Sequence, residues 1–136
     1  MNEKVFLSEY FNKCAKHLED VEIINEAINA KKIILESSAN SKKLIFAGNG
    51  ASASIANHAS LDFTKQGKIK SVNFNESAFI TAFANDFGYE NWLSKSLEFY
   101  AEPGDTLILI SCSGTSANVV NAAKYAKEHK INLITF

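Results

Sequence analysis

The chain has 136 residues, of which 46% are hydrophobic and 21% are charged, and its formal net charge is −1 at pH 7. A chain of this length can bury enough apolar surface to fold without disulfides or metal ions. The near-neutral charge and the absence of arginine from the sequence argue against a nucleic-acid partner, because no side chain can make the planar, two-pronged contacts that suit guanine and phosphate.

The sequence contains no sign of export or of a membrane anchor. Its start, "MNEKVFLSEYFNKC", is polar and interrupted by charges, so it lacks the apolar region of a signal peptide, and no segment is long enough to span a bilayer. Cys14 and Cys112 are too far apart in sequence to form the disulfide framework of a small secreted domain. We therefore expect a cytoplasmic protein with no membrane partner.

The first half of the chain predicts helices, then a strand, a turn and a helix. Apolar residues recur at helical spacing from about Glu3 to Asn40, which predicts two or three helices. "KLIFAG" is a short apolar run typical of a buried parallel strand. After the glycine turn, "SASIANHASLDFTKQG" predicts a helix with Ser52 as its N-cap and Gly67 as its C-terminal stop.

The second half repeats this alternation. "IKSVNF" predicts a second strand, and "NESAFITAFANDFGYENWLSKSLEFYA" predicts helices that break near Asn85 to Gly88. "TLILIS" predicts a third strand, "CSGTS" a loop, "ANVVNAAKYAKEHK" a helix and "INLITF" a fourth strand. Strands that alternate with helices predict an α/β fold with a parallel sheet between helical layers.

The predicted organisation is one domain over residues 1–136, with N-terminal helices over 1–40 and a parallel α/β core over 43–136. A parallel strand normally leads into a further loop and a covering helix, and this sequence stops within its fourth strand. We therefore expect either that the C-terminal part of the core is missing or that a partner chain covers that edge.

Two loops are candidate ligand sites, because ligands of open α/β sheets bind beyond the carboxyl ends of the strands. In "ISCSGTSANV", hydroxyl groups surround Gly114, whose missing side chain lets backbone amides approach an anion. This loop suits a phosphate monoester; the alternative is a tight turn that only caps a helix. "GNGAS" matches neither the dinucleotide-binding pattern nor a P-loop, so we expect no nucleotide cofactor. Its Asn49 and Ser52 suit a hydroxyl-bearing ligand.

His58 and Asp62 are four residues apart and share one face of their predicted helix. They could form an ordinary hydrogen-bonded pair, supply two ligands of a metal site whose other ligands are not visible, or transfer protons for a sugar phosphate, with Asp62 as the base. Asp86 could offer a carboxylate to substrate hydroxyls or only end a helix in an Asx turn.

The motifs "AGNGASASIANH" and "LISCSGTSANVVNAAKYAK", joined by "TAFANDFGYENWLSKSLE", resemble the sugar isomerase (SIS) domain family. The resemblance covers nearly the whole chain and implies a three-layer, flavodoxin-like fold. Within the family the motifs are most similar to the phosphoheptose isomerases, which convert sedoheptulose 7-phosphate into D-glycero-D-manno-heptose 7-phosphate for lipopolysaccharide or capsule heptose. The resemblance implies that the phosphate binds Ser111, Ser113 and Ser116, and that the sugar lies beside Asn49, Ser52 and Asp86.

The resemblance also implies roles for the helical pair. His58 matches a histidine that is a metal ligand in the zinc-containing members, and Asp62 matches a glutamate that is both ligand and catalytic base. Aspartate is one methylene shorter, so Asp62 would have to reach about 1.5 Å further. The family's remaining functional glutamine and histidine lie on a C-terminal helix beyond a fifth strand, outside this sequence.

Members of the family are typically tetramers with sites between subunits. The resemblance therefore implies a homo-oligomer in which a neighbour's His58 contributes to the site, with zinc as the one implied cofactor.

Two functions follow from these observations. The first is a phosphosugar aldose–ketose isomerase, which the complete set of phosphate-loop serines favours. The second is a non-catalytic SIS module that binds a phosphosugar or a protein partner, such as the bacterial replication initiator bound by some family members. The aspartate in place of glutamate favours this second function.

Overall fold

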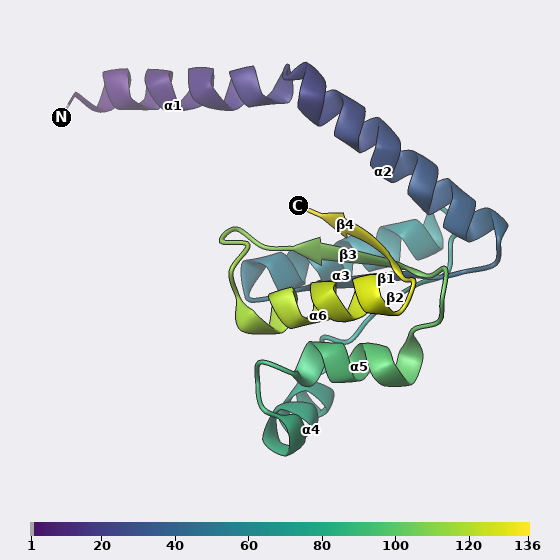
Figure 1. Cartoon of the computed structure of the whole chain (residues 1–136). Coiled ribbons are helices and arrows are strands. Elements are labelled where there is room, and N and C mark those ends of the chain that lie inside the picture. The colour runs from purple at the N-terminus through teal and green to yellow at the C-terminus, as the bar shows by residue number, and fades with distance from the viewer. Residues whose placement is uncertain (1) are drawn as a thin grey trace. The chain divides into compact units, whose positions relative to one another are not determined.

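The computed structural model describes residues 2–136, which form two compact units that divide between Lys32 and Ile33 (Figure 1). The first unit contains α1 (Glu3–Leu18) and the start of α2 (Val21–Ala39). The side chain of Asn2 caps α1 by accepting a hydrogen bond from the backbone N–H of Lys4 at 3.1 Å. The predicted N-terminal helices are therefore confirmed as two helices.

The apolar side chains of this first unit are exposed. No residue of α1 is buried, and Phe11 and Leu18 leave 63% and 79% of their surface accessible. The other large exposed apolar residues of α1 and of α2 up to Lys32 are Val5, Phe6, Leu7, Tyr10, Val21, Ile23, Ile24 and Ile28. None of the helices formed by residues 2–136 combines the length and hydrophobicity that a bilayer-spanning segment requires.

The second unit contains a four-stranded, fully parallel sheet with the strand order β2-β1-β3-β4. The strands are β1 (Leu44–Gly48), β2 (Ser71–Asn73), β3 (Thr106–Ile110) and β4 (Asn132–Thr135). In the central pair Leu44 lies opposite Thr106 and Gly48 lies opposite Ile110, so β1 and β3 begin and end at the same levels. The predicted parallel α/β fold is confirmed.

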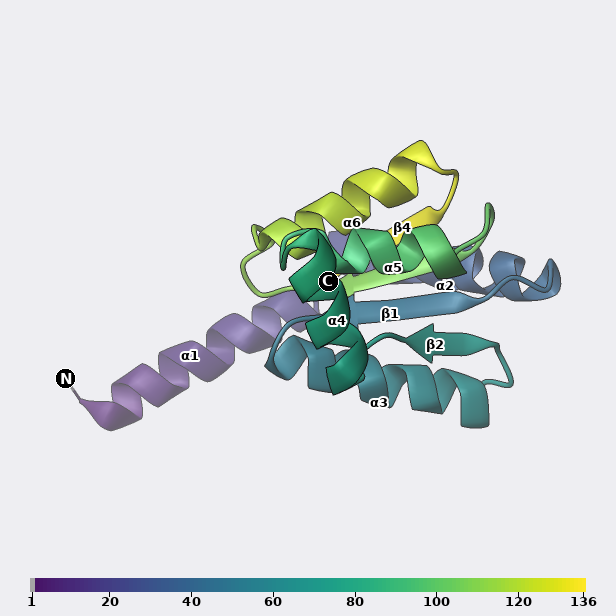
Figure 2. The same ribbon diagram turned by 90° about the horizontal axis from the view of Figure 1, so that it is seen from below.

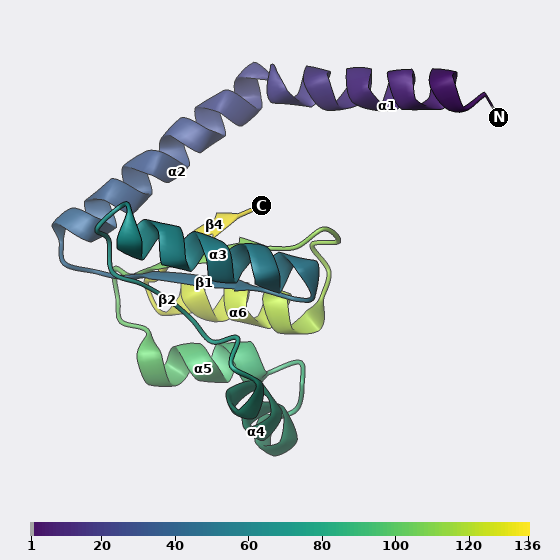
Figure 3. The same ribbon diagram turned by 180° about the vertical axis from the view of Figure 1, so that it is seen from behind.

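Helices cover both faces of this sheet. α3 (Ala51–Lys65) lies on one face, and α5 (Trp92–Tyr100) and α6 (Ala117–Glu128) lie on the other, with α4 (Ser77–Phe87) beside α5 (Figures 2 and 3). Successive strand residues point to opposite faces. Ile45 and Leu107 accordingly pack into the core with residues of α5 and α6, whereas the Phe46 ring lies 5.4 Å from that of Phe63 in α3.

One local prediction needs correction. The N-cap of α3 is Gly50, not Ser52, which is the second residue of the helix. Gly50 has φ 54°, a left-handed conformation that favours glycine, so the backbone and not a side chain starts this helix. The predicted break near Asn85 to Gly88 is confirmed: α4 ends at Phe87 with Gly88 as its C-cap, and Asn85 and Asp86 lie in its last turn.

The predicted end of α3 is confirmed. α3 ends at Lys65, just before Gly67 as predicted, but the left-handed residue of the following turn is Lys68, with φ 57°. The glycine signal therefore gave the approximate position of the helix end and not its conformation.

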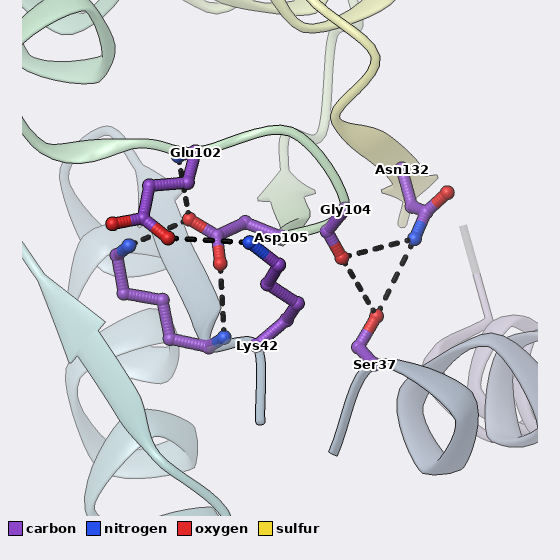
Figure 4. Close-up of polar contacts among 7 residues, drawn as sticks. Ser37, Lys42, Glu102, Gly104, Asp105 and Asn132 are labelled. Carbon is purple, nitrogen blue, oxygen red and sulfur yellow. Dashed lines mark hydrogen bonds and ion pairs between the residues drawn. The ribbon is translucent and has the colours of Figure 1, made fainter. Parts of the chain in front are cut away.

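A buried carboxylate joins β1 and β3 at their amino ends (Figure 4). Asp105 is fully buried and accepts hydrogen bonds from the backbone N–H of Lys43 at 3.0 Å, from the Lys43 ammonium at 2.6 Å and from the backbone N–H of Glu102 at 2.8 Å. Beside it, the exposed ion pair of Lys42 and Glu102 spans 3.2 Å. Two lysine–carboxylate pairs thus lie next to each other at the amino ends of β1 and β3. The carboxylate of Asp105 is buried, and that of Glu102 is exposed.

We expect Asp105→Ala to lower the free energy of unfolding by about 3 kcal/mol or more, because it removes one partner of a buried ion pair and leaves two N–H groups without an acceptor. The neighbouring Glu102→Ala should cost less than about 1 kcal/mol, since its ion pair is exposed. Urea denaturation of both variants and the wild type measures the difference. Equal losses would show that Asp105 is not the main polar link between β1 and β3.

Candidate functional site

The chain changes direction in the sheet between β1 and β3. After β1 it forms β2 on one side of that strand, and after β2 it crosses to form β3 on the other side. The loops that leave the carboxyl ends of β1 and β3 therefore diverge, and such a switch point is where open α/β sheets bind ligands. The first loop leads into α3 and the second into α6.

A pocket of about 240 Å³ lies between these two loops. It brings together most of the residues predicted to bind substrate: Asn49, Ser52, Ser111, Ser113 and Ser116, with Ala51, Ile110 and Cys112 completing the lining. Residues that are more than 60 positions apart in the sequence thus meet because β1 and β3 are neighbours in register.

Gly48 permits the close approach of the elements behind this pocket. A Cβ atom on Gly48 would lie 2.8 Å from the carbonyl oxygen of Ile110 and 2.9 Å from the backbone carbon of Ser52. Both atoms belong to the backbone, so neither can move away from an added Cβ without a shift of the backbone itself. The end of β1 therefore requires glycine so that β3 and α3 can both pack against it.

Residues 111–116 form the loop after β3, here called the serine loop. Its own serine hydroxyl groups hold it in shape by accepting hydrogen bonds from its backbone. Ser111 Oγ accepts a hydrogen bond from the backbone N–H of Gly114 at 3.1 Å, and Ser113 Oγ accepts one from the N–H of Thr115 at 3.3 Å. A serine hydroxyl that accepts one hydrogen bond still has its own hydrogen to donate. Both serines can therefore donate to a ligand in the pocket while they hold the loop in shape.

The pocket suits an anion although its lining has no charged side chain. α3 and α6 both begin at its edge, and neither has a side-chain cap. Helix amino ends carry partial positive charge and free backbone N–H groups. Together with the serine hydroxyls they can neutralise and hydrogen-bond a phosphate group.

Two further side chains, which the sequence did not single out, contact Asn49 from outside the pocket lining. Asn118 and Asn49 exchange two hydrogen bonds, each 2.9 Å long, and the Tyr89 hydroxyl donates to Asn49 Oδ1 at 3.4 Å. Asn118 lies in the first turn of α6 and Tyr89 between α4 and α5. An asparagine at a helix start and a tyrosine after a glycine are common, so the sequence held no signal for either contact.

The predicted pair of His58 and Asp62 does form, but outside this pocket. His58 Nε2 lies 3.3 Å from Asp62 Oδ2, and the two side chains are 75% and 42% exposed. They line a separate, mainly apolar depression on α3 with Ser54, Ile55 and Ala59. Since helical residues advance by roughly 100° each, His58 lies roughly 240° around the helix from Ser52.

Asp86 also lies outside the pocket lining. Its exposed carboxylate accepts a hydrogen bond from the side chain of Asn85 at 2.9 Å. Asp86 lies three residues before Tyr89 in the sequence, and the Tyr89 hydroxyl contacts Asn49. The segment that carries Asp86 therefore comes close to the pocket, while Asp86 itself does not line it.

The residues of one chain do not complete a zinc site. Protein zinc sites use at least three side-chain ligands. Across residues 2–136, His, Cys, Asp and Glu form no group of three that could hold a metal ion. His58 and Asp62 would supply two ligands at most, and we derive no chemical step through a metal.

Comparison with known proteins agrees with this geometry. The family model described as "SIS domain" matches residues 9–136. The phosphoheptose isomerase of Buchnera aphidicola subsp. Acyrthosiphon pisum (strain Tuc7) is 36% identical over 143 residues, an alignment that covers 98% of this chain and 74% of the relative. That of Aliarcobacter butzleri is 35% identical and is covered over 61% of its length, with 79% of this chain aligned.

Solved structures agree as well. The phosphoheptose isomerase GmhA from Neisseria gonorrhoeae superposes with a TM-score of 0.86 at 28% identity, covering 98% of this chain and 74% of that one. A phosphoheptose isomerase from Francisella tularensis, at 23% identity and a TM-score of 0.80, shares the fold. The three-layer parallel architecture, the pocket between β1 and β3 and the family match over nearly all of the sequence lead to one conclusion: the chain belongs to the SIS domain family.

Proposed function

We propose that this chain is a phosphosugar aldose–ketose isomerase that converts sedoheptulose 7-phosphate into D-glycero-D-manno-heptose 7-phosphate, a step toward the heptose of lipopolysaccharide or capsule. The observation that carries the proposal is the pocket of uncharged hydrogen-bond donors between β1 and β3. The relatives named phosphoheptose isomerase support the choice of sugar.

The phosphate of the substrate binds the serine loop in this proposal. Ser111, Ser113 and Ser116 donate hydroxyl hydrogens, and the amino end of α6 supplies the favourable dipole. Asn49 and Ser52 face the sugar from the other loop, and Asp86 contacts it from the segment before Tyr89. The phosphate end is far from the reacting carbons, so its binding energy can orient the carbonyl end.

The chemistry requires a base. The ring opens, the base removes the proton next to the carbonyl, and the resulting enediol is protonated on the neighbouring carbon. Asp62 is the candidate base, and His58, which is hydrogen-bonding distance away, keeps its carboxylate oriented and can exchange a proton with a sugar oxygen.

A second copy of the chain would bring Asp62 to the pocket. His58 and Asp62 point away from the pocket of their own chain, and exposed Ile55 and Leu61 lie on the same helix. Exposed apolar residues also line α1 and the start of α2. Apolar surface of this kind favours association, so we propose a homo-oligomer, a tetramer by family resemblance, with sites shared between copies.

The proposed setting is the cytoplasm. Cys14 and Cys112 are both free thiols, which suits a reducing compartment. Zinc would need ligands beyond His58 and Asp62, and the proposed mechanism assigns it no step.

One observation favours the second candidate function, a non-catalytic SIS module. The candidate base is remote from the pocket of its own chain and is a shorter aspartate where the resembled family has glutamate. Such a module would bind a phosphosugar or a protein partner without turnover. Turnover of sedoheptulose 7-phosphate separates the two functions.

We expect the protein to isomerise sedoheptulose 7-phosphate and Asp62→Asn to lower kcat by about 10²- to 10⁴-fold, the usual contribution of a general base, with a small change in KM. Product formation is measured with and without added zinc. Turnover by wild type but not by the variant supports Asp62 as the base. Absence of turnover in wild type, with sedoheptulose 7-phosphate still raising Tm, would contradict the isomerase and favour the binding module.

We expect Ser113→Ala to raise the KM for sedoheptulose 7-phosphate by about one to two orders of magnitude, because it removes a hydrogen bond to a charged group. Thr115→Val is the matched control in the same loop, since Thr115 does not line the pocket. Calorimetric titration with inorganic phosphate checks the cause. If both variants bind phosphate as wild type does, the serine loop is not the phosphate site.

The shared site predicts complementation between two impaired variants, assayed at a substrate concentration well below the KM of Ser113→Ala. Asp62→Asn retains an intact pocket, and Ser113→Ala retains an intact His58–Asp62 pair. After co-expression, random mixing of the two variants leaves about a quarter of the shared sites with an intact pocket from one copy and an intact Asp62 from the other. The activity should therefore return to about a quarter of the wild-type activity. Light scattering of each variant checks the oligomeric state. No recovery in mixed oligomers, or a monomeric wild type, would contradict a site shared between copies.

A further inference from the structure

The side chain of Asn49 has only one hydrogen-bonding group left for a ligand. A carboxamide has two N–H hydrogens and an oxygen with two lone pairs. Asn49 Nδ2 donates to Asn118 Oδ1 at 2.9 Å, which uses one hydrogen. Asn49 Oδ1 accepts from Asn118 Nδ2 at 2.9 Å and from the Tyr89 hydroxyl at 3.4 Å, which uses both lone pairs. One N–H of Asn49 remains.

Asn118 is the fixed member of this pair. Only 2% of its surface is exposed, and it lies in the first turn of α6 beside Val119, which belongs to the hydrophobic core. Asn49, in contrast, is half-buried and lines the pocket. A buried polar group that is hydrogen-bonded through both its nitrogen and its oxygen resists turning alone, because that would leave a donor and an acceptor unpaired.

The two-bond geometry also fixes which end of each amide faces the other. If Asn49 alone turned over, its nitrogen would face the nitrogen of Asn118 and its oxygen the oxygen of Asn118. Both hydrogen bonds would be lost at once. A joint turn of both amides would keep both bonds, so the pair fixes the place of the Asn49 side chain against α6 and not which of its two ends faces the ligand.

We infer that Asn118 is a positioning residue that holds the side chain of Asn49 at the pocket, with one hydrogen-bonding group of Asn49 left for the sugar phosphate. The inference rests on the proposed function for the identity of that ligand. In the orientation that the structure shows, the remaining group is an N–H, which meets an acceptor such as a carbonyl, hydroxyl or phosphate oxygen. A donor fixed before the substrate arrives needs no reorganisation when negative charge develops on that oxygen.

A double-mutant cycle tests the inference. Turnover of sedoheptulose 7-phosphate is measured for wild type, Asn49→Ala, Asn118→Ala and the double variant. We expect each single change to lower kcat/KM roughly tenfold, the factor for one hydrogen bond, with the loss divided between kcat and KM in the same way for both. The double variant should be no worse than Asn49→Ala, because Asn118 acts through Asn49.

Two controls accompany the cycle. Asn121→Ala removes a side chain on the same helix that also bonds another segment, the carbonyl of Glu90, and does not touch Asn49; its kcat/KM should stay within about twofold of wild type. Asn118→Leu keeps the branched shape of the side chain but has no hydrogen-bonding group, so it serves if Asn118→Ala does not fold. Losses that multiply in the double variant, or an equal loss in Asn121→Ala, would overturn the inference.

A second measurement needs no turnover. The side-chain amide hydrogens of Asn49 should exchange slowly with water in the wild type, as seen by NMR, and faster in Asn118→Leu but not in Asn121→Ala, because leucine removes the acceptor of the Asn49 N–H. Titration with inorganic phosphate under the same conditions reports on the pocket. Wild type without isomerase activity would contradict the proposed function alone, whereas unchanged exchange at Asn49 in Asn118→Leu would overturn the role of Asn118.

Discussion

The in-register pairing of β1 with β3 is the constraint on which the rest of this structure depends. Leu44 pairs with Thr106 and Gly48 with Ile110, so the two strands end at one level. Their loops then leave toward α3 and α6 from adjacent points, and the pocket lies between them. A shift of this pairing by one residue would turn every side chain of one strand to the opposite face and separate the loops.

Polar links hold both ends of this strand pair. At the amino ends, Asp105 bonds the backbone and the ammonium group of Lys43. At the carboxyl ends, Asn118 bonds Asn49 twice. The apolar core between them can stabilise many arrangements of similar volume, whereas these directional bonds accept only one. The pocket is therefore held by contacts outside its own lining as well as by the serine loop.

The exposed features of the molecule fit the proposed homo-oligomer. His58 and Asp62 form a pair on the outer side of α3, and the apolar residues of α1 remain accessible. An acid–base pair needs to be near the reacting carbons, and an apolar helix face is stabilised when it is covered. In the proposed oligomer, the proposed base of one copy would lie beside the proposed phosphate pocket of another.

The sequence by itself determined the strands, the ligand loops and the family. "LIFAG" and "TLILI" are continuous apolar runs because both faces of these strands are buried, and the small and hydroxyl residues after them mark turns that approach a ligand. Local patterns of this kind act over a few residues. They predicted Asn49, Ser52 and the serines Ser111, Ser113 and Ser116 as neighbours of one ligand, and the structure places these residues around one pocket.

Only the tertiary structure decided which side chains complete that pocket and which do not. Asn49 and Asn118 are 69 positions apart, and Lys43 and Asp105 are 62 apart, so neither contact leaves a local pattern in the sequence. Ser52 was wrongly predicted as an N-cap because α3 begins after Gly50, whose φ of 54° starts the helix without a side-chain cap. The position of Asp62 on the outer face of α3 likewise depends on which side of that helix meets the sheet. Hydrogen bonds between distant segments are fixed by strand order and helix packing, and these arise only when the whole chain folds.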